Sequence, residues 1–236
     1  MKILVVPDVH NHTAEVERQI ARYPADRVIF LGDYFDSFGD TPQMAAQTAA
    51  WLKESLARPE RLHLYGNHDL WYRFPRHPQI SWIGSGFTPA KSREISAILT
   101  PDDWAKMKLV EFVGDIALCH AGIGEEVFGH PINGVSRERV ETLCAEAMRD
   151  AEAMVDHPVF DESGIVWLRW WHLEPLAAFS QFVGHTPSRE LRIESAHGRH
   201  NVCLDTMGRY LGLIEDGRMA VIDDEAGRVT WWQDPS

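Results

Sequence analysis

The stretch KILVVPDVH (residues 2–10) decides how this chain folds. It is a short apolar run that ends in a carboxylate and an imidazole. Runs of this length that are rich in Val, Ile and Leu indicate buried β-strands. The same pattern returns further along the chain, each time with a polar tip that contains glycine. The recurrences are RVIFLGDYFD (27–36), RLHLYGNHD (61–69), IALCHAG (116–122) and SQFVGHT (180–186).

Helical patterns separate the first three of these runs. Residues 13–23 are amphipathic, and residues 41–57 begin with Thr41-Pro42, a good cap and first-turn pair. The order strand, helix, strand, helix, strand predicts a parallel βαβαβ core. A further helix is expected at residues 136–155, between Pro131 and Pro158.

The last third of the chain has a different pattern. Short strand-like runs are separated by glycines, and Glu-Asp-Gly (215–217) suits a tight hairpin turn. We therefore expect an antiparallel region here that forms a second sheet packed on the first. The expected strands are residues 191–194, 201–204, 210–215, 219–223 and 229–232.

Length and composition indicate one domain over residues 1–236, since the chain has 236 residues and 44% of them are hydrophobic. Residues 71–101 and 123–163 do not fit the core pattern. Both follow strand tips, so we expect them to be inserted loop or cap segments that cover a site.

Net charge and cysteine content indicate the class of binding partner and the cellular compartment. The net charge of -12 argues against stable binding of duplex nucleic acid. The 3 cysteines have no metal or disulfide spacing, which favours a reducing cytoplasm. No apolar stretch approaches the ~18 residues of a membrane span.

Polar side chains gather at the ends of the predicted strands. Ligands of open α/β sheets bind outside the carboxyl ends of the strands, so these side chains should converge. Mixed oxygen and nitrogen ligands suit manganese, iron, zinc, cobalt or nickel. There are more candidate ligands than one ion needs. Two ions ~3.5–4 Å apart that share one carboxylate would use all of them. The candidates are Asp8, His10, Asp33, Asn67, His120 and His185.

Five motifs together resemble the calcineurin-like metallophosphoesterase superfamily. They are Asp8-x-His10, Gly32-Asp33-x-x-Asp36, Gly66-Asn67-His68-Asp69, His120-Ala121-Gly122 and Gly184-His185-Thr186. Trp167-Leu168-Arg169 and the run from Asn201 to Thr206 are similar to the phosphoprotein phosphatase branch, which includes the diadenosine tetraphosphatases.

The resemblance implies a four-layer α/β/β/α sandwich, in which two mixed sheets are flanked by helices. It implies that Asp8 and His10 hold a first metal, that Asp33 bridges, and that Asn67, His120 and His185 hold a second. His68 would be the general acid, with Asp69 orienting it, and Arg169 would contact the phosphate together with Asn67. The ions would be two divalent cations, with manganese expected first and iron, zinc, nickel, cobalt or magnesium as alternatives.

The chain departs from the pattern at two positions. Ser37 stands where the protein phosphatases have a phosphate-binding arginine, and Pro187 stands where many cousins have a further histidine. One bidentate clamp on the phosphate is therefore missing. Arg73, or another residue of the 71–101 segment, is a candidate to replace it.

The resemblance and the motifs predict a binuclear metal-dependent phosphoesterase of the cytoplasm, with a phosphorylated substrate. A bridging hydroxide would attack in line, and a phosphomonoesterase similar to the protein phosphatases is the first hypothesis. A nucleoside polyphosphate hydrolase or phosphodiesterase is the alternative. This alternative is motivated by the missing arginine and by aromatics that either pack in the core or stack on a base. They are Trp71, Tyr72, Phe74, Trp82, Trp170 and Trp171. A non-catalytic metal-binding module is the third reading.

Overall fold

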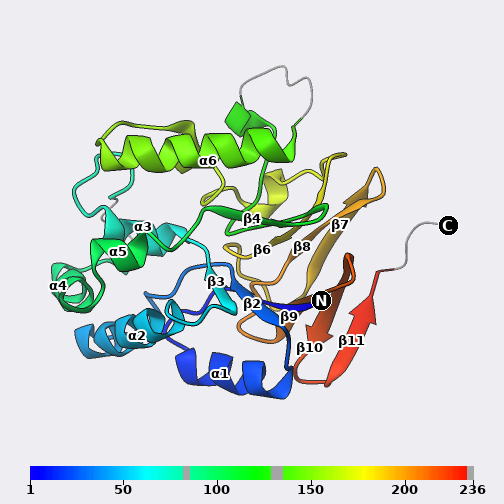
Figure 1. The fold of residues 1–236 in the computed structure, drawn as a ribbon, viewed down its shortest axis with the longest axis horizontal. Helices are drawn as coiled ribbons and strands as arrows, with labels where there is room; N and C mark the ends of the chain where they lie inside the picture. Colours follow the sequence, from blue (N-terminus) through cyan, green and yellow to red (C-terminus); the bar gives the residue numbers. More distant parts are fainter. Residues whose placement is uncertain (82–85, 129–134, 233–236) are drawn as a thin grey trace.

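Two β-sheets packed face to face form the centre of the computed structural model, which describes residues 1–81, 86–128 and 135–232 (Figure 1). The first sheet has the order β11-β10-β9-β1-β2-β3 and the second has the order β4-β5-β6-β8-β7. The strands are β1 (Lys2–Val6), β2 (Arg27–Phe30), β3 (Arg61–His63), β4 (Val110–Val113), β5 (Ile116–Cys119), β6 (Ser180–Val183), β7 (Arg192–Ala196), β8 (Arg199–Cys203), β9 (Tyr210–Glu215), β10 (Arg218–Asp223) and β11 (Arg228–Trp231).

The predicted parallel βαβαβ core is confirmed. Strand β1 pairs in parallel with β2, and β2 pairs in parallel with β3. The helices α1 (Thr13–Arg22) and α2 (Pro42–Ser55) connect them. The Thr41 side chain accepts a hydrogen bond from the backbone N–H of Met44 at 3.2 Å, so the cap expected from Thr-Pro forms.

The prediction that the whole last third forms a second sheet is wrong in part. Strands β7 and β8 join the second sheet, but β9 pairs antiparallel with β1 and carries β10 and β11 into the first. The hairpin turn itself is as expected, because Asp216 and Gly217 have φ angles of 51° and 78°. A hairpin pattern fixes which strands are neighbours, whereas the sheet edge that receives the hairpin depends on distant residues.

The apolar core has two parts that follow the alternation of strand side chains. Ile3 and Val5 of β1 belong to a cluster between the sheets, where Phe182 and Val202 of the second sheet meet them. Leu4 and Val6 point to the other face, and their cluster includes residues of α1 and α2. Burial of each such side chain contributes about 1.5–3 kcal/mol. Figure 1 shows α1 and α2 outside the first sheet and α6 outside the second, which confirms the four-layer sandwich.

The two segments predicted as inserted loops contain helices. The first holds the end of α3 (Asn67–Arg73) and α4 (Pro89–Ile98), which packs on α2, and α5 (Pro101–Trp104) follows. Thr88 and Thr100 cap α4 and α5 with proline at the first turn, the same signal as Thr41-Pro42.

The second segment contains two short 3₁₀ turns, η1 (Glu126–Phe128) and η2 (Pro158–Phe160), and the helix α6 (Arg137–Glu152). The helix expected at residues 136–155 is confirmed as α6; Ser136 caps it, and it packs against β4. A further 3₁₀ turn, η3, covers Trp170–His172. Residues 82–85 and 129–134 of the predicted insertions lie outside the described residues. Within the described ranges, none of the helices combines the length and apolarity that crossing a membrane requires.

Candidate metal centre

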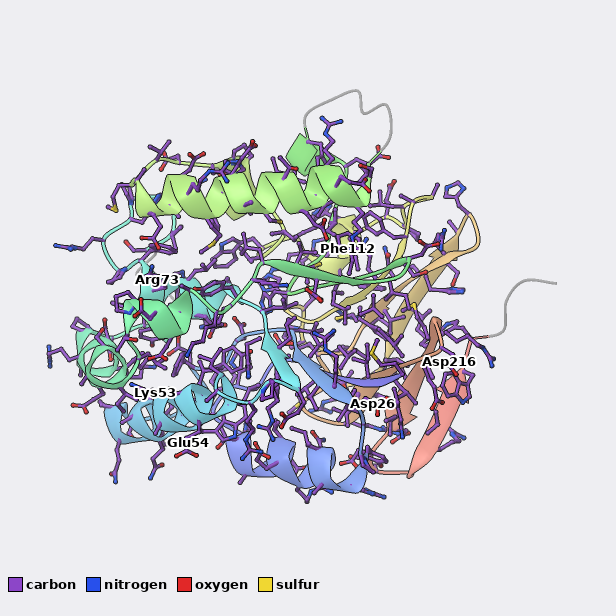
Figure 2. All side chains as sticks on the ribbon, in the orientation of Figure 1. Asp26, Lys53, Glu54, Arg73, Phe112 and Asp216 are labelled. Carbon is purple, nitrogen blue, oxygen red and sulfur yellow. The ribbon has the colours of Figure 1, made fainter. Side chains whose placement is uncertain are left out.

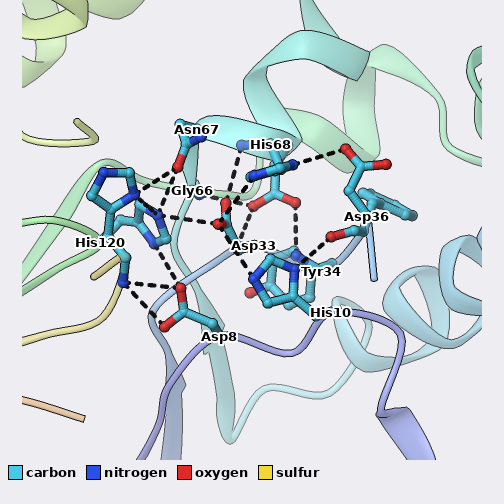
Figure 3. Close-up of polar contacts among 12 residues, drawn as sticks. Asp8, His10, Asp33, Tyr34, Asp36, Gly66, Asn67, His68 and His120 are labelled. Atoms are coloured by element: carbon cyan, nitrogen blue, oxygen red, sulfur yellow. Dashed lines mark hydrogen bonds and ion pairs between the residues drawn. The ribbon is translucent and has the colours of Figure 1, made fainter. Parts of the chain in front are cut away.

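The residues predicted as metal ligands all follow strand ends, and the structure brings them together at one edge of the two sheets (Figure 3). Three of the five strands concerned belong to the first sheet and two to the second. The prediction of convergence is therefore confirmed. The residues that meet are Asp8 and His10 after β1, Asp33 after β2, Asn67 after β3, His120 after β5 and His185 after β6.

Sharp turns of the backbone aim these side chains inward. His10, Asp33 and His185 have φ angles of 40°, 50° and 67°, in the left-handed region that non-glycine residues rarely adopt. Glycine is needed where two tips touch. A Cβ at Gly66 would lie 2.1 Å from Asp33 Oδ1, and one at Gly184 would lie 2.0 Å from Asp8 Oδ2.

Three acceptor atoms meet at the buried end of the cluster. Asn67 Oδ1 lies 3.0 Å from His120 Nε2 and 2.9 Å from His185 Nδ1, and the two ring nitrogens are 3.2 Å apart. The other nitrogen of each ring meets a backbone carbonyl, Leu31 O at 3.0 Å from His120 Nδ1 and Trp167 O at 3.1 Å from His185 Nε2. A carbonyl bonds only to a ring N–H, so the inward nitrogens of the neutral rings carry lone pairs.

Lone pairs that face one another without a proton between them are the pattern of a cation site. Asp33 Oδ2 lies 3.4 Å from His120 Nε2 and adds a carboxylate to the set. Asp33, His120 and His185 can each direct one ligand atom to a common point. We call this group, with Asn67, the inner site.

A second group shares Asp33. Asp8, His10 and Asp33 can also direct ligand atoms to one point. His10 Nδ1 bonds the carbonyl of Phe35 at 2.8 Å, which leaves Nε2 facing Asp33 Oδ2 at 3.8 Å. The Asp8 carboxylate accepts the backbone N–H of His185 at 3.0 Å, so it joins the two sheets. We call this group the outer site, because the His10 side chain is 31% exposed.

The buried carboxylates repel one another. Burial raises the pKa of Asp8, and the charge of Asp33 raises it further against the opposing effect of His120. Burial and the Asp33 charge raise the pKa of Asp69 to about 7, and burial and the Asp8 charge raise that of Asp205 to about 8. Groups with such shifts concentrate at functional sites. Divalent cations would compensate this charge.

The surroundings shift the pKa values of the two inner histidines in opposite directions. Burial alone would lower the pKa of His120, but the carboxylates of Asp33 and Asp8 raise it to about 9. Burial and the neighbouring charge of His120 lower the pKa of His185. A cation between the rings would favour the neutral form of both.

His68 lies beside the cluster, with Nε2 at 4.0 Å from Asp33 Oδ2 (Figure 3). The prediction that Asp69 orients His68 is wrong, because Asp36 Oδ2 holds His68 Nδ1 at 2.9 Å. Asp69 instead accepts the backbone N–H groups of Gly66, Asp33 and Tyr34 at 2.8–2.9 Å. Asp69 lies in the first turn of α3, so its carboxylate faces the backbone of that turn and of the neighbouring strand tip.

Two arginines were expected near the substrate. Arg169 donates from Nη1 to the carbonyl of His185 at 3.3 Å, which places it at the edge of the inner site. The proposal that Arg73 (labelled in Figure 2) replaces the missing arginine is wrong. Arg73 pairs with Glu152 of α6 and stacks on Phe74. Arg73 is six residues beyond Asn67 on α3, about 9 Å along the helix and on a different face.

A cavity of about 550 Å³ adjoins the inner site. Trp167, whose carbonyl holds His185, and Arg169 lie in its wall, together with the 65% exposed Trp171 and the acidic Asp161 and Glu162. Trp71, by contrast, is 1% exposed and packs against His68. The wall of the cavity therefore uses tryptophans from the late segment, and the one at position 71 belongs to the core.

Residues without an assigned role also face the site. Asp36 holds His68, and the charge of Asp8 acts on Asp205. Lys91 and Tyr72 bind Asp36 and so reach the site through it. Asp36 and Asp205 lie within the quoted motifs, so the motifs were the available signal. Lys91 reaches Asp36 from 55 residues away, and no local pattern predicts that contact.

Comparisons with known proteins concern the fold and the family. A cold-active protein-tyrosine phosphatase from a psychrophilic Shewanella species has a TM-score of 0.66 at 14% identity, over 98% of this chain and 80% of that one. A protein serine/threonine phosphatase from Saccharomyces cerevisiae has a TM-score of 0.49 at 14% identity, over 100% of this chain and 81% of that one. At such identities the first match shows a common fold. No curated protein sequence matches significantly.

The family model of calcineurin-like phosphoesterases matches residues 1–213. That range contains both candidate sites and every strand tip that forms them. The chain belongs to the calcineurin-like phosphoesterase family.

Proposed function

We propose that the protein is a phosphomonoesterase that works with two divalent cations, one in the inner site and one in the outer site. The observation that carries this proposal is the set of ligand atoms Asn67 Oδ1, His120 Nε2 and His185 Nδ1, which lie within 3.2 Å of one another and face one another with lone pairs when both rings are neutral. Asp8 and His10 would hold the second cation, and Asp33 lies where both can share it. When bound, the cations would neutralise phosphate charge and lower the pKa of a bound water to ~7. Manganese is the first candidate for both sites.

The chain's own residues supply positioning and proton transfer. The oxygen of the attacking water forms a bond to phosphorus while the bond from phosphorus to the ester oxygen breaks. His68, held at Nδ1 by Asp36, points Nε2 toward the cluster and can give its proton to the departing oxygen. Arg169, fixed by the His185 carbonyl, can contact the phosphate at the mouth of the cavity.

The test is hydrolysis of 4-nitrophenyl phosphate with manganese present and after chelation. We expect turnover with manganese only. Asp33→Ala should reduce it by ~10³-fold or more, because both sites lose a ligand. Asp115→Ala is the matched control, since its carboxylate is 74% exposed and pairs with Arg199 on the surface. A wild-type rate in Asp33→Ala would contradict the proposal.

One observation favours a second candidate, a hydrolase of phosphodiesters or nucleoside polyphosphates. The cavity beside Arg169 presents the exposed Trp171, a surface on which a base can stack. Bis(4-nitrophenyl) phosphate and a dinucleoside tetraphosphate, compared with the monoester by kcat/KM, separate the two. Preference for either over the monoester, reduced ~10-fold or more by Trp171→Ala, would replace the first proposal by the second.

A further inference from the structure

A buried lysine stands behind the residue that orients His68. Lys91 Nζ donates to Asp36 Oδ1 at 2.6 Å, and Asp36 Oδ2 is the atom that holds His68 Nδ1 at 2.9 Å. The Lys91 side chain is 3% exposed and that of Asp36 is 0% exposed. The two oxygens of a single carboxylate therefore connect a fixed cation to the ring that faces the cluster.

Further contacts lock this carboxylate. Tyr72 donates its hydroxyl to the same Asp36 Oδ1 at 2.5 Å. Lys91 also binds Asp40, at 2.9 Å and 3.1 Å to its two oxygens. Asn11 joins Asp40 to Ser37, the position where an arginine was expected. A Cβ at Gly86 would lie 2.7 Å from Asp36 Cβ, so the segment before α4 packs closely on Asp36.

Helix stability does not explain this placement. Lys91 lies in the first turn of α4, next to the positive end of the helix dipole, where a cation is unfavourable. Burying an ammonium group also costs free energy unless it is paired. Two carboxylates meet Lys91, and one of them is the partner of His68. Because Lys91 is enclosed and paired, it does not take the missing arginine's place at the phosphate.

We propose that Lys91 is a positioning residue for proton delivery: it fixes the Asp36 carboxylate so that the His68 ring is held toward the departing oxygen. This inference rests on the proposed function. It gives α4, in the segment expected to be an insertion, a part in the chemistry. Lys91 touches neither the reacting atoms nor the candidate ligands, and it acts through Asp36 alone.

The experiment compares two monoesters in the manganese-loaded full chain. 4-Nitrophenyl phosphate releases a stable anion that needs little protonation, whereas an alkyl phosphate such as glycerol 2-phosphate needs a proton at its leaving oxygen. We expect Lys91→Met to reduce kcat for the alkyl ester by ~10–100-fold and for the activated ester by less than ~3-fold, since general acid catalysis contributes ~10²–10⁴-fold in total. Lys91→Arg should restore most of the alkyl ester rate, because it restores the cation.

Two further variants keep the test decisive. Lys53→Met is the matched control, because Lys53 of α2 (labelled in Figure 2) donates to the carbonyl of Ile98 at the other end of α4, at 2.7 Å. It should leave the ratio of the two rates unchanged. Tyr72→Phe removes the other donor to Asp36 Oδ1 and should reproduce the selective loss to a smaller extent, which serves if Lys91→Met does not fold.

Equal losses on both esters in Lys91→Met would overturn the proposal. If Lys91→Met does not fold, equal losses on both esters in Tyr72→Phe would do the same, and so would a selective loss in Lys53→Met. Failure of the proposed function is distinguishable, because the wild type would then hydrolyse neither ester, whereas the Lys91 proposal is read from the ratio of the two rates.

Discussion

The inner and outer sites share Asp33 but differ in almost every other respect. The inner site is closed: Asn67, His120 and His185 are 2%, 0% and 6% exposed, and backbone carbonyls fix both rings. The outer site adds only Asp8 and the partly exposed His10. Pro187 supplies no further imidazole. A closed site with more fixed ligands binds an ion more tightly, so we expect the inner site to hold its cation firmly and the outer site to exchange its cation readily.

The largest difference between the two sites is expected when one ligand of each is replaced by alanine. His120→Ala should lose the inner ion and reduce phosphatase activity by more than the ~10–100-fold that an outer-shell change costs. His10→Ala should lose only the outer ion. Metal analysis after gel filtration in metal-free buffer measures both, with the wild type as reference. Equal ion content in the two variants would show that the sites do not differ.

The effect of manganese on thermal unfolding sharpens the same comparison. An ion at ~100 times its Kd stabilises the fold by ~2.7 kcal/mol, which raises Tm by ~5–10 °C for a chain of this size. We expect His10→Ala to keep most of this shift and His120→Ala to lose it. Calorimetry with and without manganese provides the measurement. Loss of the shift in His10→Ala alone would reverse the assignment of the tight site.

The ligands of both sites were predictable because each lies within a few residues of the end of a strand. His120 is the residue after β5, and Asp8 lies two residues past β1. The topology of parallel strands brings such tips together without any knowledge of packing. The four-layer fold followed from the same motifs through the family resemblance.

What the sequence did not predict depends on tertiary docking. Lys91 contacts Asp36 only because α4 packs on α2. The local periodicity of apolar residues does not predict which helices pack together. The pairing of β9 with β1 joins residues more than two hundred positions apart, such as Lys2 and Glu215. The family resemblance implied that Asp69 orients His68, but the two are neighbours on a helix, and adjacent helix residues point in different directions.

His63 provides the baseline for both sites, since it shows what burial does to an imidazole that faces no carboxylate. Its ring lies between the hydroxyls of Tyr34 and Ser55, both at 2.9 Å, and it is 1% exposed. Burial, with the charge of Arg61, lowers the pKa of His63 to about 3. The unfolded chain, with a pKa of ~6.5, binds a proton first as the pH falls. The stabilising contribution is therefore complete above pH ~6.5 and is lost progressively toward pH ~3, by ~2 kcal/mol at pH 5.

Urea unfolding of the chelated protein between pH 7.5 and pH 5 measures this, with His63→Gln as the variant that cannot titrate. The free energy of unfolding of the wild type should fall by ~2 kcal/mol more than that of His63→Gln over this range. Parallel curves would mean that His63 is protonated as easily in the folded chain as in the unfolded one, and burial would then not explain the lowered pKa of His185 either.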